Sequence, residues 1–165
     1  LGKFQEVSPS VFGADFGFSM DENTLVKTSI DKDRKIIYLQ LCFYLPGLTT
    51  SQLRELYKKY AGDSLIIADS AEPRLIYELK SNCNIVPSIK GQGSITYGIA
   101  LLQDYDLIID EGEGSAPLIK ELNNYRWLEK KSQTPIDKYN HALDAIRYAV
   151  SYQLKNPNAG QYHII

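Results

Sequence analysis

Residues 11–43 read VFGADFGFSMDENTLVKTSIDKDRKIIYLQLCF and contain three segments with the composition of β-strands. The segments 11–18, 24–31 and 35–43 are rich in β-branched and aromatic residues, which pack well on a pleated surface. The polar run 31–34 separates the last two segments and has the composition of a tight turn. The stretch therefore predicts three consecutive strands joined as an antiparallel meander.

The chain after residue 48 predicts helices alternating with short strands. Leu53, Leu56, Tyr57 and Tyr60 follow helical spacing, and Gly62 is a typical helix end. The expected order is helix 49–60, strand 65–68, helix 72–80, strand 85–86, helix 97–103, strand 107–110, helix 117–124, extended segment 125–129, and a final helix from 134 to about 154. This order predicts an α/β fold, a mixed β-sheet flanked by helices, in the outline of a ribonuclease H-like architecture.

Length and composition limit the possible functions. At 165 residues and 44% hydrophobic content, we expect one domain over residues 1–154 and a flexible tail over 155–165. The chain starts at Leu1 and its only methionine is Met20, which suggests a piece of a longer polypeptide. The net charge of −2 confines any nucleic-acid surface to a local patch. No apolar run approaches the roughly 20 residues that cross a bilayer, so we expect no membrane.

Three separate segments carry aspartates where a metal site could form. Asp15 and Asp69 lie at or near the ends of apolar segments that read as buried strands. In the final helix, a rotation of about 100° per residue places Asp137, His141 and Asp144 on one face. Carboxylate oxygens suit Mg²⁺ or Mn²⁺ better than zinc, and two such ions can hydrolyse a phosphodiester. We expect Asp15, Asp69 and Asp144 to be catalytic metal ligands, with His141 and Asp137 as further candidates.

Structural roles are open for the same residues. Asp69 could cap the helix that follows it, as could Ser70. Asp137 completes a Thr-Pro-Ile-Asp sequence typical of a capping box. Asp144 could pair with Arg147 or Lys138, and His141 could orient a ligand without binding metal.

A glycine-rich segment provides candidates for DNA contact. Lys90 opens the sequence KGQGS, which ends at Ser94 just before a predicted helix. Backbone N–H groups at such a helix start can bind phosphate together with the lysine. Arg74 is a weaker candidate. We expect Lys90, Ser94 and Arg74 to contact DNA.

Five short motifs occur in an order that resembles a known family. They are GADFG at 13–17, ADSAEP at 68–73, KGQGSI at 90–95, ELNNYRW at 121–127 and NHALDAIRY at 140–148. Together they resemble the C-terminal nuclease domain of bacteriophage terminase large subunits. By this resemblance Asp15, Asp69 and Asp144 match the family's metal acids, and His141 matches a position at or beside the metal.

The resemblance implies a function and a setting. It implies a metal-dependent endonuclease that cuts concatemeric viral double-stranded DNA during genome packaging, with low sequence specificity and two Mg²⁺ or Mn²⁺ ions. The implied partners are an N-terminal ATPase motor domain on the same polypeptide, a portal protein and a small terminase subunit. The implied location is the cytoplasm of the infected bacterial host.

Three other functions are compatible with parts of the sequence. Junction resolvases and transposase or integrase cores also assemble acids on ribonuclease H-like sheets. The sequence DFGFS at 15–19 is similar to the phosphate-binding turn of actin-like and sugar-kinase proteins, although His141 and Asp144 argue against a nucleotide-binding module. A non-catalytic packaging module would follow if the acids did not converge.

Overall fold

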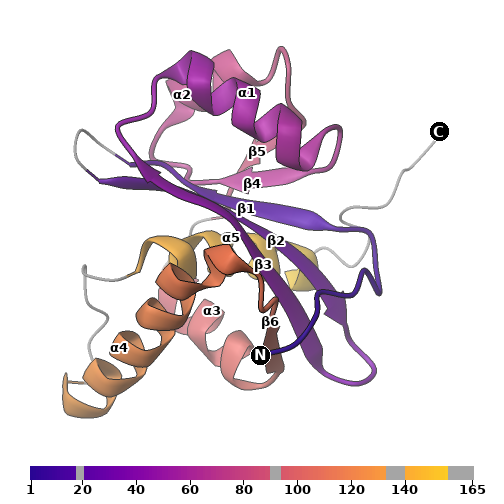
Figure 1. Ribbon diagram of the computed structural model, residues 1–165, viewed down its shortest axis with the longest axis vertical. Coiled ribbons are helices and arrows are strands. Elements are labelled where there is room, and N and C mark those ends of the chain that lie inside the picture. Colours follow the sequence, from indigo (N-terminus) through magenta and orange to yellow (C-terminus); the bar gives the residue numbers. More distant parts are fainter. Residues whose placement is uncertain (18–20, 90–93, 133–139, 156–165) are drawn as a thin grey trace.

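The computed structural model describes residues 1–17, 21–89, 94–132 and 140–155, without the side chains of residues 94–97, 113 and 125–132. In this part of the chain, six strands form one mixed sheet with helices on both faces (Figure 1). The strand order is β5-β4-β1-β2-β3-β6. The α/β layering is therefore the one that the sequence predicts.

The meander predicted from residues 11–43 is confirmed. Strands β1 (Val11–Asp15), β2 (Glu22–Asp31) and β3 (Ile36–Pro46) pair antiparallel in chain order. Asp31 closes the second turn, because its Oδ1 accepts hydrogen bonds from the backbone N–H groups of Asp33 and Arg34 at 3.1 and 3.0 Å. Strand β1 ends at Asp15, earlier than predicted, and the N–H of Gly17 binds the Asn23 side chain at 2.9 Å instead of a neighbouring strand.

Three short parallel strands extend the sheet at its two edges. Strand β4 (Ile66–Ala68) pairs with β1, β5 (Ile85–Pro87) pairs with β4, and β6 (Asp106–Ile109) pairs with β3. Because β1, β4 and β5 are parallel, their carboxyl ends lie side by side at the same end of the sheet.

Helices α1 (Thr50–Ala61) and α2 (Pro73–Leu79) cover one face. Thr49 and Gln52 form a capping box at the start of α1, and Gly62 ends it with a positive φ of 57°. Tyr57 and Leu79 are fully buried in the same cluster as Phe12 of β1. This cluster is the apolar core on the α1–α2 face.

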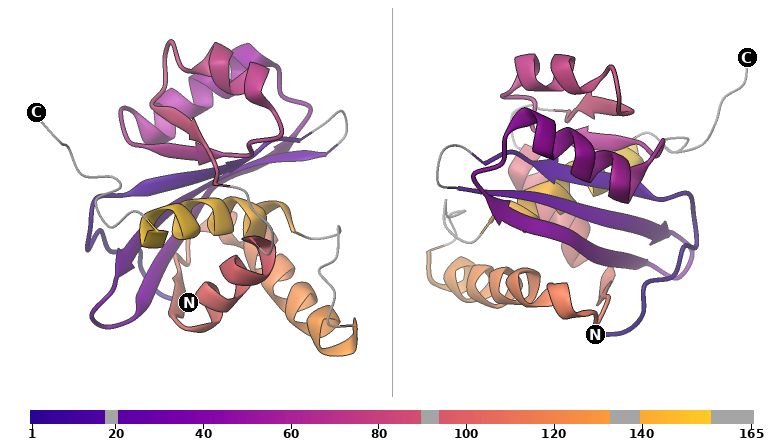
Figure 2. Two further views of the ribbon diagram at one scale, coloured as in Figure 1. Left: turned by 180° about the vertical axis from the view of Figure 1, so that it is seen from behind. Right: turned by 45° about the horizontal axis from the view of Figure 1, so that its top comes forward.

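Helices α3 (Ser94–Gln103), α4 (Ala116–Ser132) and α5 (His141–Lys155) cover the other face, and a short 3₁₀ helix η1 (Glu113–Ser115) precedes α4. Helix α5 lies directly against the sheet, with α3 and α4 packed beside it (Figure 2). A second apolar cluster joins α5 to the strands through Ile146, Val26 and Leu39. None of the described helices is long and apolar enough to cross a membrane.

Two sequence-based assignments were wrong. Residues 125–129 were expected to be extended, but they continue α4. The cost of keeping Tyr125 and Trp127 helical is only a few tenths of a kcal/mol each relative to good helix formers. Extending a helix that has already formed costs far less than starting one, so the preceding turns outweigh this preference. The final helix was predicted to run from 134, but Asn140 is not helical and α5 begins at His141; residues 133–139 lie outside the described residues.

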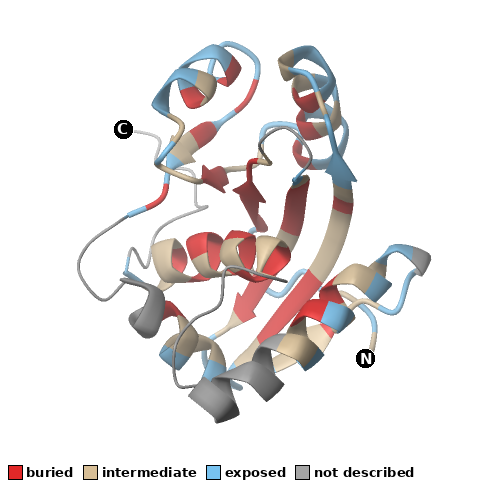
Figure 3. Cartoon of the chain, turned by 90° about the vertical axis from the view of Figure 1, so that its left-hand side faces the viewer, coloured by how far each residue is buried: buried red, intermediate tan, exposed pale blue. Residues whose placement is uncertain are grey.

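Helix α5 approaches β1 so closely that a glycine is required between them. A Cβ on Gly13 would clash with the backbone carbonyl of Ala145. On the helix side, Ala142, Ala145 and Ala149 are fully buried. Buried residues follow this seam along the central strands and α5 (Figure 3). Small residues on both sides therefore set the distance between α5 and the sheet.

We predict that Gly13→Ala destabilises the fold by about 3 kcal/mol, the upper end for overpacking, because the clashing partner is backbone and cannot rotate away. The matched control is Gly114→Ala, whose added Cβ would lie at an ordinary 3.8 Å from the Leu41 carbonyl oxygen. Urea denaturation of both variants measures the difference. Equal midpoints would contradict the proposed role of Gly13.

Candidate metal centre

The three predicted acids come from three elements that meet at the carboxyl ends of β1 and β4. Asp15 is the last residue of β1, and Asp69 directly follows β4. Ala14 pairs with Ala68 in the parallel β1–β4 ladder, so the two aspartates leave neighbouring strands at the same level. Asp144 lies in the first turn of α5, which packs on β1. The fold therefore brings together the residues that the sequence singled out.

Asp15 is a buried carboxylate held by a histidine. Only 6% of Asp15 is exposed, and its Oδ2 lies 3.2 Å from Nδ1 of His141. Burial raises the pKa of Asp15 above its usual value, and contact with His141 opposes this rise. The charges of Asp69 and Glu121 raise the Asp15 pKa further, so these acids share one electrostatic environment.

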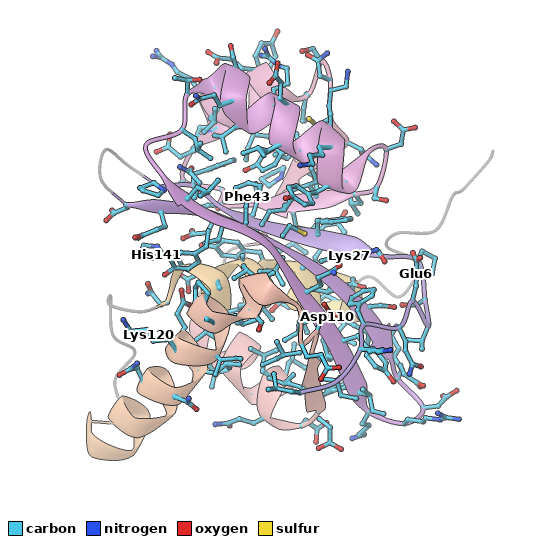
Figure 4. The ribbon with its side chains drawn as sticks, viewed as in Figure 1. Glu6, Lys27, Phe43, Asp110, Lys120 and His141 are labelled. Carbon is cyan, nitrogen blue, oxygen red and sulfur yellow. The ribbon has the colours of Figure 1, made fainter. Side chains whose placement is uncertain are left out.

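His141 lies between two carboxylates at the start of α5, where this helix reaches the ends of the central strands (Figure 4). Its Nε2 lies 3.7 Å from Oε2 of Glu22, the first residue of β2. The hydrogen bond to Asp15 raises the pKa of His141, with smaller contributions from nearby acids. The protonated imidazolium would therefore offset part of the negative charge of the metal-free centre.

Asp144 is partly buried and paired with a cation on its own helix. Burial, followed by the charge of Asp15, raises the pKa of Asp144 to about 6. Nη2 of Arg147 donates to Oδ1 of Asp144 at 3.3 Å and partly opposes the rise. The sequence-based alternative of an Asp144–Arg147 pair is thus present, and it coexists with the position of Asp144 beside Asp15.

Asp69 closes a local turn after β4. Its Oδ1 accepts a hydrogen bond from the backbone N–H of Ala71 at 2.9 Å. The residue that caps α2 is Glu72, which makes no side-chain capping bond. Neither Asp69 nor Ser70 is therefore the cap of this helix, and the Asp69 carboxylate remains at the strand end.

In their present conformations, the described side chains do not form a complete metal-coordination site. In the described part of the chain, no group of three or more His, Cys, Asp or Glu residues is spaced to hold a metal ion. Asp15, Asp69 and Asp144 instead contact His141, Ala71 and Arg147. The donor set still suits a hard divalent cation, since all three carry oxygen ligands and two are destabilised as anions by burial. Binding would require some of these side chains to turn from their present partners.

The other predicted site residues have different outcomes. Asp137 and Lys90 lie outside the described residues, and the side chain of Ser94, the first residue of α3, is not described either. Arg74 lies exposed in α2, on the opposite face of the sheet from α5. For these four residues the metal and DNA roles stay predictions.

Glu121 is a structural part of this centre to which the sequence analysis gave no role. It is 1% exposed, and its two carboxylate oxygens accept hydrogen bonds from the backbone N–H groups of Ala142 and Leu143, both at 3.0 Å. Helix N-termini leave such N–H groups without partners and attract negative charge. Glu121 of α4 therefore fixes the first turn of α5, which carries His141 and Asp144. Its position between Leu118 and Leu122, on the apolar stripe of α4, is a sequence signal for a buried acid.

The sheet, its helices and the acids at the strand ends define a domain of the ribonuclease H-like class. Residues 15–152 match the family model described as the terminase RNAseH like domain, and the chain belongs to this family.

Two relatives place the domain within larger proteins. The chain is 30% identical over 151 residues to the terminase large subunit of Bacillus phage SPP1, covering 87% of this chain and 36% of the relative. It is 29% identical over 154 residues to the PBSX phage terminase large subunit of Bacillus subtilis (strain 168), covering 87% of this chain and 35% of the relative. The chain thus spans about a third of the length of these relatives.

Solved structures share the fold. The nuclease domain of the SPP1 large terminase, crystallised with bound Mn, matches with a TM-score of 0.73 and 29% identity over 88% of this chain and 87% of that one. The P22 large terminase nuclease domain matches with a TM-score of 0.71 and 16% identity, and the match covers 93% of this chain and 86% of that one. The predicted ribonuclease H-like fold is therefore confirmed.

We predict that Asp144→Asn stabilises the metal-free domain and that the gain grows with pH. The pKa of Asp144 rises from 3.8 to about 6 on folding, so the folded state binds more protons in this window and native stability falls as pH increases through it. Removing the charge should recover up to about 3 kcal/mol at neutral pH. The measurement is urea denaturation in EDTA at several pH values. Asp63→Asn, an exposed control before β4, should show no such growth.

We predict that Glu121→Ala lowers the free energy of unfolding by about 3 kcal/mol, because two buried N–H donors lose a charged acceptor. Glu121→Gln retains an amide oxygen and should lose less. Glu55→Gln, at an exposed site in α1, is the control. Unchanged stability of Glu121→Ala in EDTA would show that Glu121 does not support α5.

Proposed function

We propose that this domain is a divalent-metal-dependent endonuclease that hydrolyses phosphodiester bonds of double-stranded DNA with low sequence specificity. The observation that carries the proposal is the meeting of Asp15, Asp69 and Asp144, from β1, the end of β4 and α5, at one edge of a ribonuclease H-like sheet. Membership of the terminase RNAseH like domain family and the similarity to the Mn-bound SPP1 nuclease domain support it.

The residues of the centre have separable roles in this proposal. Asp15, Asp69 and Asp144 hold Mg²⁺ or Mn²⁺ through carboxylate oxygens, and His141 orients Asp15 or adds a ligand. Two bound ions would supply an activated water and stabilise charge on the phosphate and the leaving oxygen. The chain contributes the fixed positions of these ligands, since β1 and α5 are rigid elements packed without space between them.

The metal-free centre is an unfavourable arrangement of charge, which favours cation binding. Buried carboxylates raise one another's pKa, and a divalent cation removes this repulsion while displacing protons. Metal affinity should accordingly increase with pH through the range in which Asp144 loses its proton.

The proposed setting is genome packaging. As part of a terminase large subunit, the domain would follow an ATPase motor on the same polypeptide and act with a portal protein and a small terminase subunit. Its substrate would be concatemeric viral DNA in the cytoplasm of an infected bacterium. Asp137, and Lys90, Ser94 and Arg74 as DNA contacts, belong to this proposal as residues to be tested.

We predict that the chain nicks and linearises supercoiled plasmid with Mn²⁺ or Mg²⁺ and not with EDTA. Asp15→Asn, Asp69→Asn and Asp144→Asn, which preserve side-chain shape, should each reduce the rate at least about 100-fold by removing a ligand charge. Agarose-gel assays measure the rates, and four-way junction DNA tests for a resolvase instead.

A second readout separates ligand loss from misfolding. Mn²⁺ should raise the melting temperature of the native chain, because an ion that binds only the folded state stabilises it, and this shift should shrink in the three variants. The control variant Asp63→Asn should retain both the plasmid cleavage and the Mn²⁺-induced rise in melting temperature. Absence of metal-dependent cleavage by a folded native chain, or full cleavage by all three variants, would contradict the proposal.

A further inference from the structure

A narrow cavity lies between the end of β5 and the outer side of α5. It is lined by Ser88, Ile89, Arg147, Tyr148, Ser151 and Lys155 and has a volume of about 10 Å³. This is room for the centre of one water-sized group, such as a water or one oxygen of a phosphate. Two serines, a tyrosine and two basic residues thus line a space that accepts a single oxygen atom.

The hydroxyls in the cavity lack partners. Ser88 is 7% exposed, and within the described residues the buried Oγ atoms of Ser88 and Ser151 make no hydrogen bond. Buried polar groups without partners destabilise a fold and are rare in proteins. Their presence on two facing elements marks a place where, among the described residues, nothing supplies an acceptor, and a bound group could do so.

The cavity adjoins two of the proposed metal ligands. The backbone N–H of Ser88 donates to the carbonyl of Ala68, the residue before Asp69, at 2.7 Å. On the other side, Arg147 donates to Asp144 at 3.3 Å. The cavity is therefore lined by one residue bonded to the neighbour of Asp69 and by another bonded to Asp144 itself.

Arg147, one of the two basic residues that line the cavity, is held in place. The Arg147 side chain is 12% exposed, its guanidinium lies 4.9 Å from the Tyr148 ring centre, and its stem crosses α3 where a Cβ on Gly98 would clash with it. One of its five N–H donors points to Asp144. The planar guanidinium has further N–H groups that can donate hydrogen bonds to a phosphate at the same time. Lys155 follows eight residues later, about 12 Å along the helix.

We infer that Ser88, Ser151, Arg147 and Lys155 form a phosphodiester subsite for the DNA strand beside the metal centre. One non-bridging phosphate oxygen enters the cavity and accepts hydrogen bonds from the two hydroxyls, while the cations offset its charge. The inference rests on the proposed nuclease function and deepens it. Such a contact positions the backbone without reading bases, which agrees with low sequence specificity.

Water is the competing occupant, and substitutions of the serines separate the two. If a phosphate oxygen fills the cavity, Ser88→Ala and Ser151→Ala should each raise the KM for Mn²⁺-dependent plasmid cleavage about fivefold, with kcat nearly unchanged. This factor corresponds to the loss of one hydrogen bond to the substrate. Their melting temperatures should stay equal to that of the native chain or rise, because an unpartnered buried hydroxyl is removed. If water fills the cavity, KM stays constant and the melting temperature falls.

Lys155→Gln tests the charge. It should make the salt dependence of kcat/KM shallower by about one counterion, whereas Lys58→Gln in α1, on the opposite face of the sheet, should not. Ser81→Ala, at an exposed site after α2, is the control for the serine variants. Lack of cleavage by the native chain would contradict the nuclease function itself. Native cleavage with unchanged KM in both serine variants would overturn only the subsite.

Discussion

The close approach of α5 to β1 is the constraint on which the centre depends. Gly13 has no side chain to separate the two backbones, and the buried alanines of α5 present a flat surface to the strand. Because of this contact, His141 and Asp144 reach the carboxyl end of β1, where Asp15 lies. The same seam orders the outer layer, since α4 holds the start of α5 through Glu121 and α3 packs against Arg147.

The buried carboxylates at the centre lower the stability of the metal-free fold and thereby favour the binding of a cation. Burial places Asp15 and Asp144 where their anionic forms are unfavourable, and His141 and Arg147 compensate only in part. Glu121 adds a further negative charge, but helix N–H groups satisfy both of its oxygens. The fold thus uses one buried acid for structure and leaves others poorly compensated beside it, as expected where folding stability yields to function.

The sequence predicted much of this arrangement, and the exceptions have physical reasons. Strand composition and the 31–34 turn were local signals, so the meander could be predicted, and the order of elements led to the sheet. The pairing of β4 with β1, which brings Asp69 level with Asp15, is a long-range contact without a local signal. Residues 125–129 followed their helical neighbours rather than their own preference. Glu121 and Glu22 escaped notice because their roles depend on partners far along the chain.

The separation of the site residues along the chain has a consequence for biosynthesis. Asp15 and His141 are 126 positions apart, and α5 occupies the middle of one face of the sheet that starts with β1. During translation the early strands leave the ribosome long before this helix exists, and their face remains uncovered until it arrives. The contact between Asp15 and His141 therefore forms only after α5 has been synthesised. Such non-local closure also predicts slow folding, and it makes the bare sheet face the surface most in need of a chaperone.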